Sequence, residues 1–104
     1  MSRLEQLQAF LKESPDDPFI LFALAKEYEK QGDDDHTKQY FLQLTREHPK
    51  YVGTYYHLGK WYERQNAVED ALKTYEKGMT VARQQGDQHA LGELAAAKLN
   101  IADE

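Results

Sequence analysis

The sequence repeats itself with a period of 34 residues, and this periodicity constrains the fold more than any other feature of the chain. When the chain is shifted by one period, similar residues coincide over more than two helical turns. The aligned pairs include Leu24 with Leu58, Ala25 with Gly59, Lys26 with Lys60, Tyr28 with Tyr62, Glu29 with Glu63 and Phe41 with Tyr75. A fixed period of about 20–50 residues indicates a repeat protein, in which each repeat is one supersecondary unit stacked on its neighbours.

Each repeat is predicted to contain two helices. In the first repeat, Asp16 and Asp17 can cap a helix that begins at Pro18, and Gly32 ends it. Pro49 closes the second helix. Asn66, which tolerates the left-handed conformation, stands in the second repeat where the first has Gly32. The predicted inner faces carry Leu21, Leu24, Ala25, Tyr28, Thr37, Phe41 and Leu44 in the first repeat, and Tyr55, Leu58, Gly59, Tyr62, Ala71, Tyr75 and Gly78 in the second.

These residues resemble the tetratricopeptide repeat (TPR) family, whose pattern is a large apolar residue, Leu, a small residue, Tyr, Ala, an aromatic residue and a late Pro. The first copy reads Leu21-x2-Leu24-Ala25-x2-Tyr28, then Thr37-x3-Phe41 and Pro49, and the second reads Tyr55-x2-Leu58-Gly59-x2-Tyr62, then Ala71-x3-Tyr75. The second copy departs from the pattern at Arg83, where the late proline is expected. The resemblance implies an all-α fold in which antiparallel helix-turn-helix repeats stack as a short right-handed superhelix, a TPR-like α-solenoid.

The flanking segments extend the repeat, which predicts one domain of six antiparallel helices. Leu7 and Phe10 align with Phe41 and Leu44 one period later, so residues 2–14 are interpreted as the second helix of a preceding repeat. The predicted parts of this single TPR domain, residues 1–104, are the N-terminal half repeat 2–14, repeat 1 over 18–51, repeat 2 over 52–85 and a C-terminal capping helix over 87–100.

Charge and composition exclude several classes of function. Thirteen Lys and Arg against eighteen Asp and Glu give a net charge of −5, which argues against nucleic acid as the main partner. The absence of cysteine excludes disulfide scaffolds and thiolate zinc sites. No apolar run approaches the roughly 20 residues that span a bilayer, and the first residues lack the apolar segment of a secretory signal. We therefore expect a soluble cytoplasmic protein with no membrane partner.

The sequence carries no recognisable catalytic motif. It has no glycine-rich phosphate loop, no GxSxG elbow and no HExxH. The run Asp33-Asp34-Asp35-His36 is the cluster that most resembles a ligand set, but acidic residues there also fit the start of a helix, where the helix dipole favours them. We therefore expect no enzymatic activity, no cofactor and no metal site.

The family resemblance implies instead that the first helices of the repeats line a concave groove that binds a peptide or a helix of a partner protein. The groove positions in such repeats are the second, fifth, ninth, twelfth and thirteenth of the first helix. In this chain they are Phe19, Phe22, Lys26, Glu29 and Lys30 in repeat 1, and Gly53, Tyr56, Lys60, Glu63 and Arg64 in repeat 2. The candidate binding residues selected from them are Phe19, Phe22, Lys26, Tyr56, Lys60 and Glu63.

Two alternatives remain open for these residues and for the function. The aromatic side chains contact a partner, or they pack against the N-terminal helix through Leu7 or Leu11. The protein is a peptide-binding module, or it is a structural module that self-associates weakly through the groove or a helix end.

The expected partner is an unidentified protein or peptide, and lysines among aromatic residues favour an acidic and apolar segment. One TPR subclass grips the C-terminal carboxylate of chaperone peptides with a lysine at position five and an asparagine at position nine. Phe22 and Lys26 stand at those places here, so this carboxylate clamp is predicted to be absent.

Overall fold

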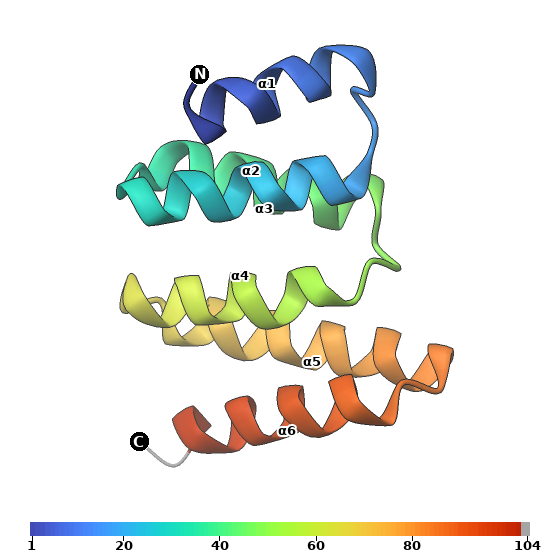
Figure 1. Ribbon diagram of the computed structural model, residues 1–104. Helices are drawn as coiled ribbons and strands as arrows, with labels where there is room; N and C mark the ends of the chain where they lie inside the picture. The colour runs from blue at the N-terminus through green and yellow to red at the C-terminus, as the bar shows by residue number, and fades with distance from the viewer. Residues whose placement is uncertain (103–104) are drawn as a thin grey trace. The chain divides into compact units, whose positions relative to one another are not determined.

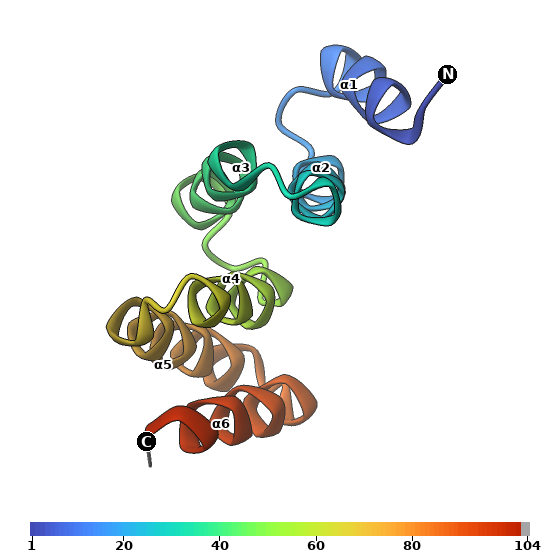
Figure 2. The same ribbon diagram turned by 90° about the vertical axis from the view of Figure 1, so that its left-hand side faces the viewer.

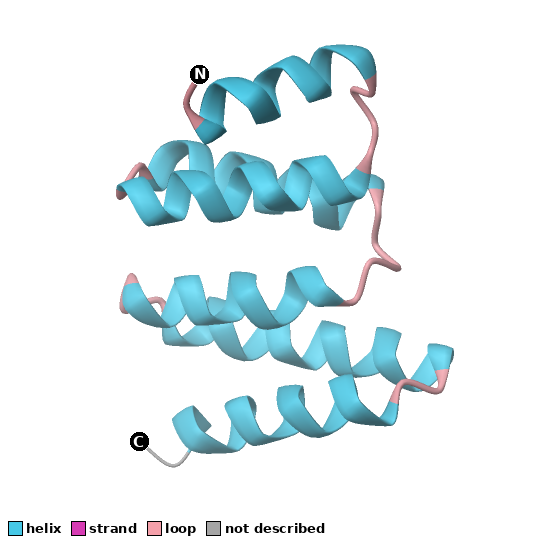
Figure 3. Ribbon diagram, viewed as in Figure 1, coloured by secondary structure: helices cyan, strands magenta, loops and turns pink. Residues whose placement is uncertain are grey.

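The computed structural model describes residues 1–102, which form six α-helices (Figure 1). The helices are α1 (Arg3–Glu13), α2 (Pro18–Gln31), α3 (Asp34–Glu47), α4 (Gly53–Arg64), α5 (Val68–Gln85) and α6 (Gln88–Ala102). No strand occurs in this part of the chain, and Figure 3 shows short loops between the helices. The all-α helical repeat predicted from the sequence is confirmed. Within residues 1–102, none of the helices combines the length and the apolar character that crossing a membrane requires.

The chain divides into two compact units. Unit 1 spans Met1–Tyr51 and contains α1, α2 and α3, whereas unit 2 spans Val52–Glu104 and contains α4, α5 and α6. In unit 1, α2 and α3 pair antiparallel and α1 packs on α2 (Figures 1 and 2). In unit 2, α5 packs against both α4 and α6, and α4 also contacts α6.

Aspartate caps begin α2 and α3, as predicted. Asp17 accepts a hydrogen bond from the Phe19 N–H at 2.9 Å, and Asp33 accepts one from the His36 N–H at 3.1 Å. The second carboxylate oxygen of Asp33 lies 2.7 Å from Nδ1 of His36. Hydrogen bonds from the backbone and then the ring of His36 hold the pKa of Asp33 below its ordinary value. The acidic run at residues 33–36 is therefore the start of a helix.

Left-handed residues end α2, α4 and α5. Their φ angles are 77° at Gly32, 61° at Asn66 and 68° at Gly86. An L side chain rarely adopts these angles, and asparagine is the residue other than glycine that tolerates them best. The helix ends predicted at Gly32 and Asn66 are confirmed, and Gly86 ends α5 in the same way.

The core of unit 1 lies between α2 and α3. Its buried residues are Leu21, Leu24, Ala25 and Tyr28 from α2, and Thr37, Phe41 and Leu44 from α3, which are the residues predicted for the inner faces. Helix α1 adds Leu7, which packs against Leu24 and Tyr28. Nε2 of Gln8 also donates a hydrogen bond to the Tyr28 hydroxyl at 3.0 Å. Helix α1 thus covers one face of α2.

Phe10 does not follow the repeat alignment. Its side chain is 57% exposed, whereas Leu44, its counterpart one period later, is fully buried. Helix α1 uses the face of Leu4, Leu7 and Leu11 to pack on α2. The predicted inner position is therefore correct for Leu7 and wrong for Phe10.

The core of unit 2 joins all three of its helices. Its buried members are Tyr55, Ala71, Tyr75, Val81, Ala82, Leu94, Ala97 and Ile101, and Tyr62 packs against them half-buried. A Cβ built on Gly59 would lie 2.6 Å from Cζ of Tyr75, and one on Gly78 would lie 2.5 Å from Cβ of Tyr55. Both distances are too short for carbon atoms that are not bonded, so glycine at these positions lets the helices approach.

We predict that Gly59→Ala destabilises the protein, because the new methyl group would displace the Tyr75 ring. Overpacking of this kind costs about 1–3 kcal/mol of unfolding free energy. Urea unfolding followed by circular dichroism measures the loss. Gly92→Ala is the matched control, since a Cβ at Gly92 meets no atom within 4 Å. Alanine is the better helix former, so this control should gain about 0.5–1 kcal/mol. An unchanged urea midpoint for Gly59→Ala would contradict the close approach.

Candidate functional site

A hollow of about 570 Å³ opens beside α2 in unit 1. Its lining residues are Phe19, Phe22, Ala23, Lys26, Glu27, Glu29 and Lys30 from α2, and Arg3 from α1. The structure therefore brings together Phe19, Phe22 and Lys26, the three candidate binding residues of repeat 1. They meet because positions three, four and seven residues apart share one face of a helix.

The two phenylalanines of this hollow differ in burial. The Phe19 side chain is 70% exposed. Phe22 is half-buried, and its ring centroid lies 6.3 Å from that of Phe41 and 5.9 Å from that of Tyr51. The contacts of Phe22 thus run toward α3 and the end of unit 1. The apolar cluster that seats α1 on α2 is built around Leu24 instead.

Ion pairing limits the charge that the hollow presents. Nζ of Lys26 lies 2.8 Å from Oε1 of Glu29, one turn further along α2. The other charged residues of the lining are Arg3, Lys30 and Glu27. Three cations therefore face two carboxylates, and the hollow is slightly positive although the whole chain carries a net charge of −5.

The first helix of unit 2 has the same arrangement one period later. Nζ of Lys60 lies 5.5 Å from the ring centroid of Tyr56 and 3.6 Å from Oε2 of Glu63. The lysine is therefore placed between an aromatic face, which attracts cations, and a carboxylate. Direct contacts thus link the three candidate residues of repeat 2.

Glu63 also has a structural role that sequence reasoning did not anticipate. It accepts a hydrogen bond from the hydroxyl of Tyr75, which is fully buried on α5. Burial first, and the carboxylate of Glu63 second, hold the pKa of Tyr75 well above its ordinary value. Glu63 therefore connects the surface of α4 to the core of unit 2.

A smaller hollow of about 240 Å³ lies beside Tyr56 in unit 2. Gly53 and His57 of α4 line it together with Ala90 and Glu93 of α6. Tyr56 is half-buried and packs against the core cluster of unit 2. The Tyr56 ring is thus divided between the core and this hollow.

Sequence reasoning missed several lining residues of the α2 hollow. Ala23 and Glu27 follow Phe19 at helical spacing, so extending the helical face by one position would have found them. Arg3 comes from another helix, and no local pattern indicates that it lines this hollow.

Removal of the Tyr75 hydroxyl tests its bond to Glu63. Tyr75→Phe should lower the unfolding free energy at pH 7 by about 1.5–3 kcal/mol, because a hydrogen bond to a charged group is lost in a buried place. The raised pKa stabilises the folded state at pH values below the ordinary tyrosine value of 10.0, and this contribution declines as the pH rises above it. The variant should therefore lose less stability than the wild type between pH 9 and about 11.

Urea unfolding at each pH measures both effects. Tyr62→Phe is the control at pH 7, since it removes the hydroxyl of a half-buried tyrosine of α4 and should change stability little. Equal stability of Tyr75→Phe and wild type at pH 7 would show that the hydrogen bond contributes nothing.

Comparisons with solved structures identify similar proteins. A crystal structure of a tetratricopeptide repeat domain protein from Salinibacter ruber is 46% identical, covers 84% of this chain and 97% of its own, and has a TM-score of 0.78. A solution NMR structure of such a domain protein from the same organism is 47% identical, with 84% and 88% coverage and a TM-score of 0.81. A solution structure of a Bordetella parapertussis protein is 25% identical, with 99% and 90% coverage and a TM-score of 0.84.

No protein-family model matches the sequence, and no curated protein matches it. The solved structures carry the assignment, since two of them combine high identity with coverage of most of both chains. The TPR fold generally mediates protein–protein interaction and is generally a non-catalytic scaffold. By this similarity of sequence and structure, the chain belongs to the tetratricopeptide repeat family.

Proposed function

We propose that the protein is an interaction module that binds a peptide or a helix of a partner protein through its first-helix faces. These faces carry Phe19, Phe22 and Lys26 on α2, and Tyr56, Lys60 and Glu63 on α4. The observation that carries the proposal is Phe19, a large aromatic residue that is 70% exposed at the edge of a hollow of about 570 Å³. Exposed aromatic residues beside a concave surface are typical anchors of protein interfaces.

The charges at the α2 hollow indicate the chemistry of the partner segment. Lys26 is paired with Glu29, so the exposed cations Arg3 and Lys30 are better placed to attract a ligand. An apolar side chain would fill the hollow between Phe19 and Ala23, and an acidic residue beside it would meet the cations. We therefore expect a partner segment that combines apolar and acidic residues.

Peptides selected from a random library against the purified protein test this proposal. We predict that the selected peptides are apolar and acidic. Phe19→Ala should weaken their binding by about 30-fold, the equivalent of a 2 kcal/mol anchor. Lys30→Glu should weaken binding by a smaller factor that shrinks as salt is added, because surface charges are screened. Fluorescence anisotropy gives the dissociation constants.

The matched control is Phe10→Ala, which removes a phenylalanine of similar exposure, 57%, from α1 outside the hollow. It should leave binding unchanged. Phe22→Ala is less suitable as a probe, because Phe22 also packs against Phe41 and Tyr51. Equal losses for Phe19→Ala and Phe10→Ala would contradict binding at the α2 hollow. Lys60→Glu tests the face of α4 separately.

Self-association is the second candidate function, and exposed apolar residues on the terminal helices favour it. Phe10 on α1 is 57% exposed and Leu99 on α6 is 62% exposed. Two such side chains are few for a stable interface, which buries about 1,200 Å² or more. We predict that light scattering detects a monomer at protein concentrations up to about 100 µM. Any self-association would then have a dissociation constant above this value and would be weak. A dimer that Leu99→Lys or Phe10→Lys dissociates would support self-association instead.

A further inference from the structure

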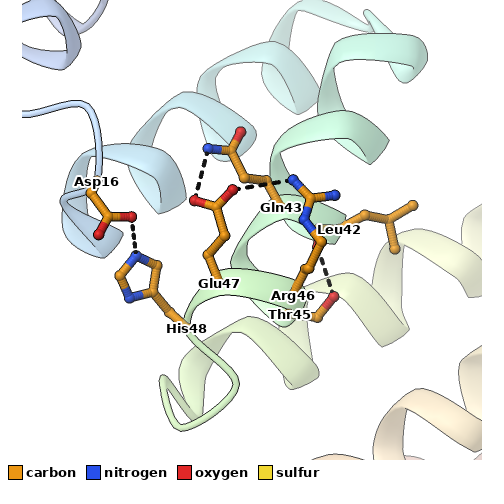
Figure 4. A network of polar contacts seen from close by, with 7 residues as sticks. All are labelled: Asp16, Leu42, Gln43, Thr45, Arg46, Glu47 and His48. Atoms are coloured by element: carbon orange, nitrogen blue, oxygen red, sulfur yellow. Dashed lines mark hydrogen bonds and ion pairs between the residues drawn. The ribbon is translucent and has the colours of Figure 1, made fainter.

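Three potential metal ligands meet at one end of unit 1. Asp16 lies in the loop before α2, Glu47 is the last residue of α3, and His48 caps the C-terminus of α3. One ligand atom of each residue lies within 4.8 Å of the other two, and Nε2 of His48 is 3.1 Å from Oδ1 of Asp16 (Figure 4). Within residues 1–102, these three residues form the group of potential metal ligands whose ligand atoms lie this close together.

Neighbouring groups hold the ligands in place. The backbone N–H of His48 donates to the Leu44 carbonyl at 2.7 Å, and the His48 carbonyl accepts from the Tyr51 N–H at 3.0 Å. On Glu47, Nε2 of Gln43 donates to Oε1 at 3.3 Å and the Arg46 guanidinium donates to Oε2 at 3.1 Å (Figure 4). Outer hydrogen bonds of this kind orient the ligands of metal sites.

The electrostatics of the cluster favour a cation. The Glu47 carboxylate accepts hydrogen bonds from Gln43 and Arg46, and one of its oxygens lies within 4.8 Å of the ligand atoms of Asp16 and His48. The Asp16 carboxylate faces the same place, so two negative groups converge on one imidazole. The cluster also lies at the C-terminus of α3, where the helix dipole is negative.

We propose that Asp16, Glu47 and His48 form a binding site for a divalent transition-metal ion, and that Zn²⁺ fits it best. One imidazole nitrogen and two carboxylate oxygens are a zinc donor set, whereas Mg²⁺ and Ca²⁺ prefer oxygen ligands alone. Zinc–ligand distances of about 2.0–2.2 Å place neighbouring tetrahedral ligands about 3.3–3.6 Å apart. Nε2 of His48 and Oδ1 of Asp16 lie 3.1 Å apart as a hydrogen-bonded pair, so they need to separate by only a few tenths of an ångström to share an ion.

The site also allows Glu47 to approach the ion and leaves space for a fourth ligand. The side chains of Asp16 and Glu47 are 79% and 36% exposed, so they can rotate to close the wider gap to Glu47. A hollow of about 460 Å³ adjoins the site and is lined by Glu47, His48 and Tyr51, among others. It provides space for the water that completes a tetrahedral zinc site with three protein ligands.

A metal ion at this site would tie together chain segments that are 32 residues apart. It would join the loop before α2 to the end of α3, the two ends of the helical hairpin of unit 1. Because the unfolded chain does not hold these ligands together, the ion binds the folded state preferentially and stabilises it. Zinc should therefore raise the melting temperature of the full chain.

Isothermal titration of the metal-free full chain with Zn²⁺ tests the proposal. We expect one ion per chain, a dissociation constant below about 100 µM and a higher melting temperature with zinc. Mg²⁺ at the same concentration should have no effect. Asp16→Asn and His48→Gln should each weaken zinc binding at least tenfold and abolish the melting shift. Co²⁺ should give the d–d absorption of a low-symmetry site in the wild type, and this absorption should be lost in both variants.

The matched control is His36→Gln, which breaks the other close histidine–aspartate pair, between His36 and Asp33, and should leave zinc binding unchanged. Circular dichroism establishes that each variant is folded. Should His48→Gln fail to fold, Asp16→Asn decides, because Asp16 is an exposed loop residue. Wild-type binding weaker than the stated limit, or unchanged zinc affinity in Asp16→Asn, overturns the proposal. So does a loss of binding in His36→Gln alone.

Discussion

The contact between the backbone of Gly59 and the ring of Tyr75 sets the distance between α4 and α5, and the rest of unit 2 is arranged around it. With no Cβ at Gly59, the aromatic ring lies flush against the first helix, and its hydroxyl reaches Glu63 one turn further on. Glu63 in turn holds Lys60, which lies near the Tyr56 ring. The surface that we propose as a binding face is thus positioned by the packing of the core beneath it.

The 34-residue repeat allowed much of the fold to be predicted from the sequence. Helix ends depend on local chemistry, such as a left-handed Gly32 or an Asp17 cap, so they could be read from single positions. The exposure of Phe10 could not be read in this way. A repeat alignment assumes that every helix packs through the same face, whereas α1 packs on α2 through the face of Leu4, Leu7 and Leu11.

The sequence placed part of the candidate site on one helix face, but it missed Ala23, Glu27 and Arg3 of the hollow and could not show how the charged side chains pair. Helical spacing placed Phe19, Phe22 and Lys26 on one face, but it could not show that Lys26 pairs with Glu29. The ligands of the proposed metal site were beyond sequence reasoning for another reason. His48 has no partner at helical spacing, and Asp16 lies 32 residues away, so only the antiparallel pairing of α2 and α3 brings them together.

The burial of Tyr75 makes this residue a reporter of local opening. Iodination and nitration attack the ionised phenol ring, and the Tyr75 hydroxyl is both inaccessible to solvent and committed to Glu63. The chain has seven tyrosines, and half-buried ones such as Tyr51 and Tyr56 can meet a reagent in the folded state. Modification of Tyr75 then requires unit 2 to open first, so its rate records how often α4 and α5 separate.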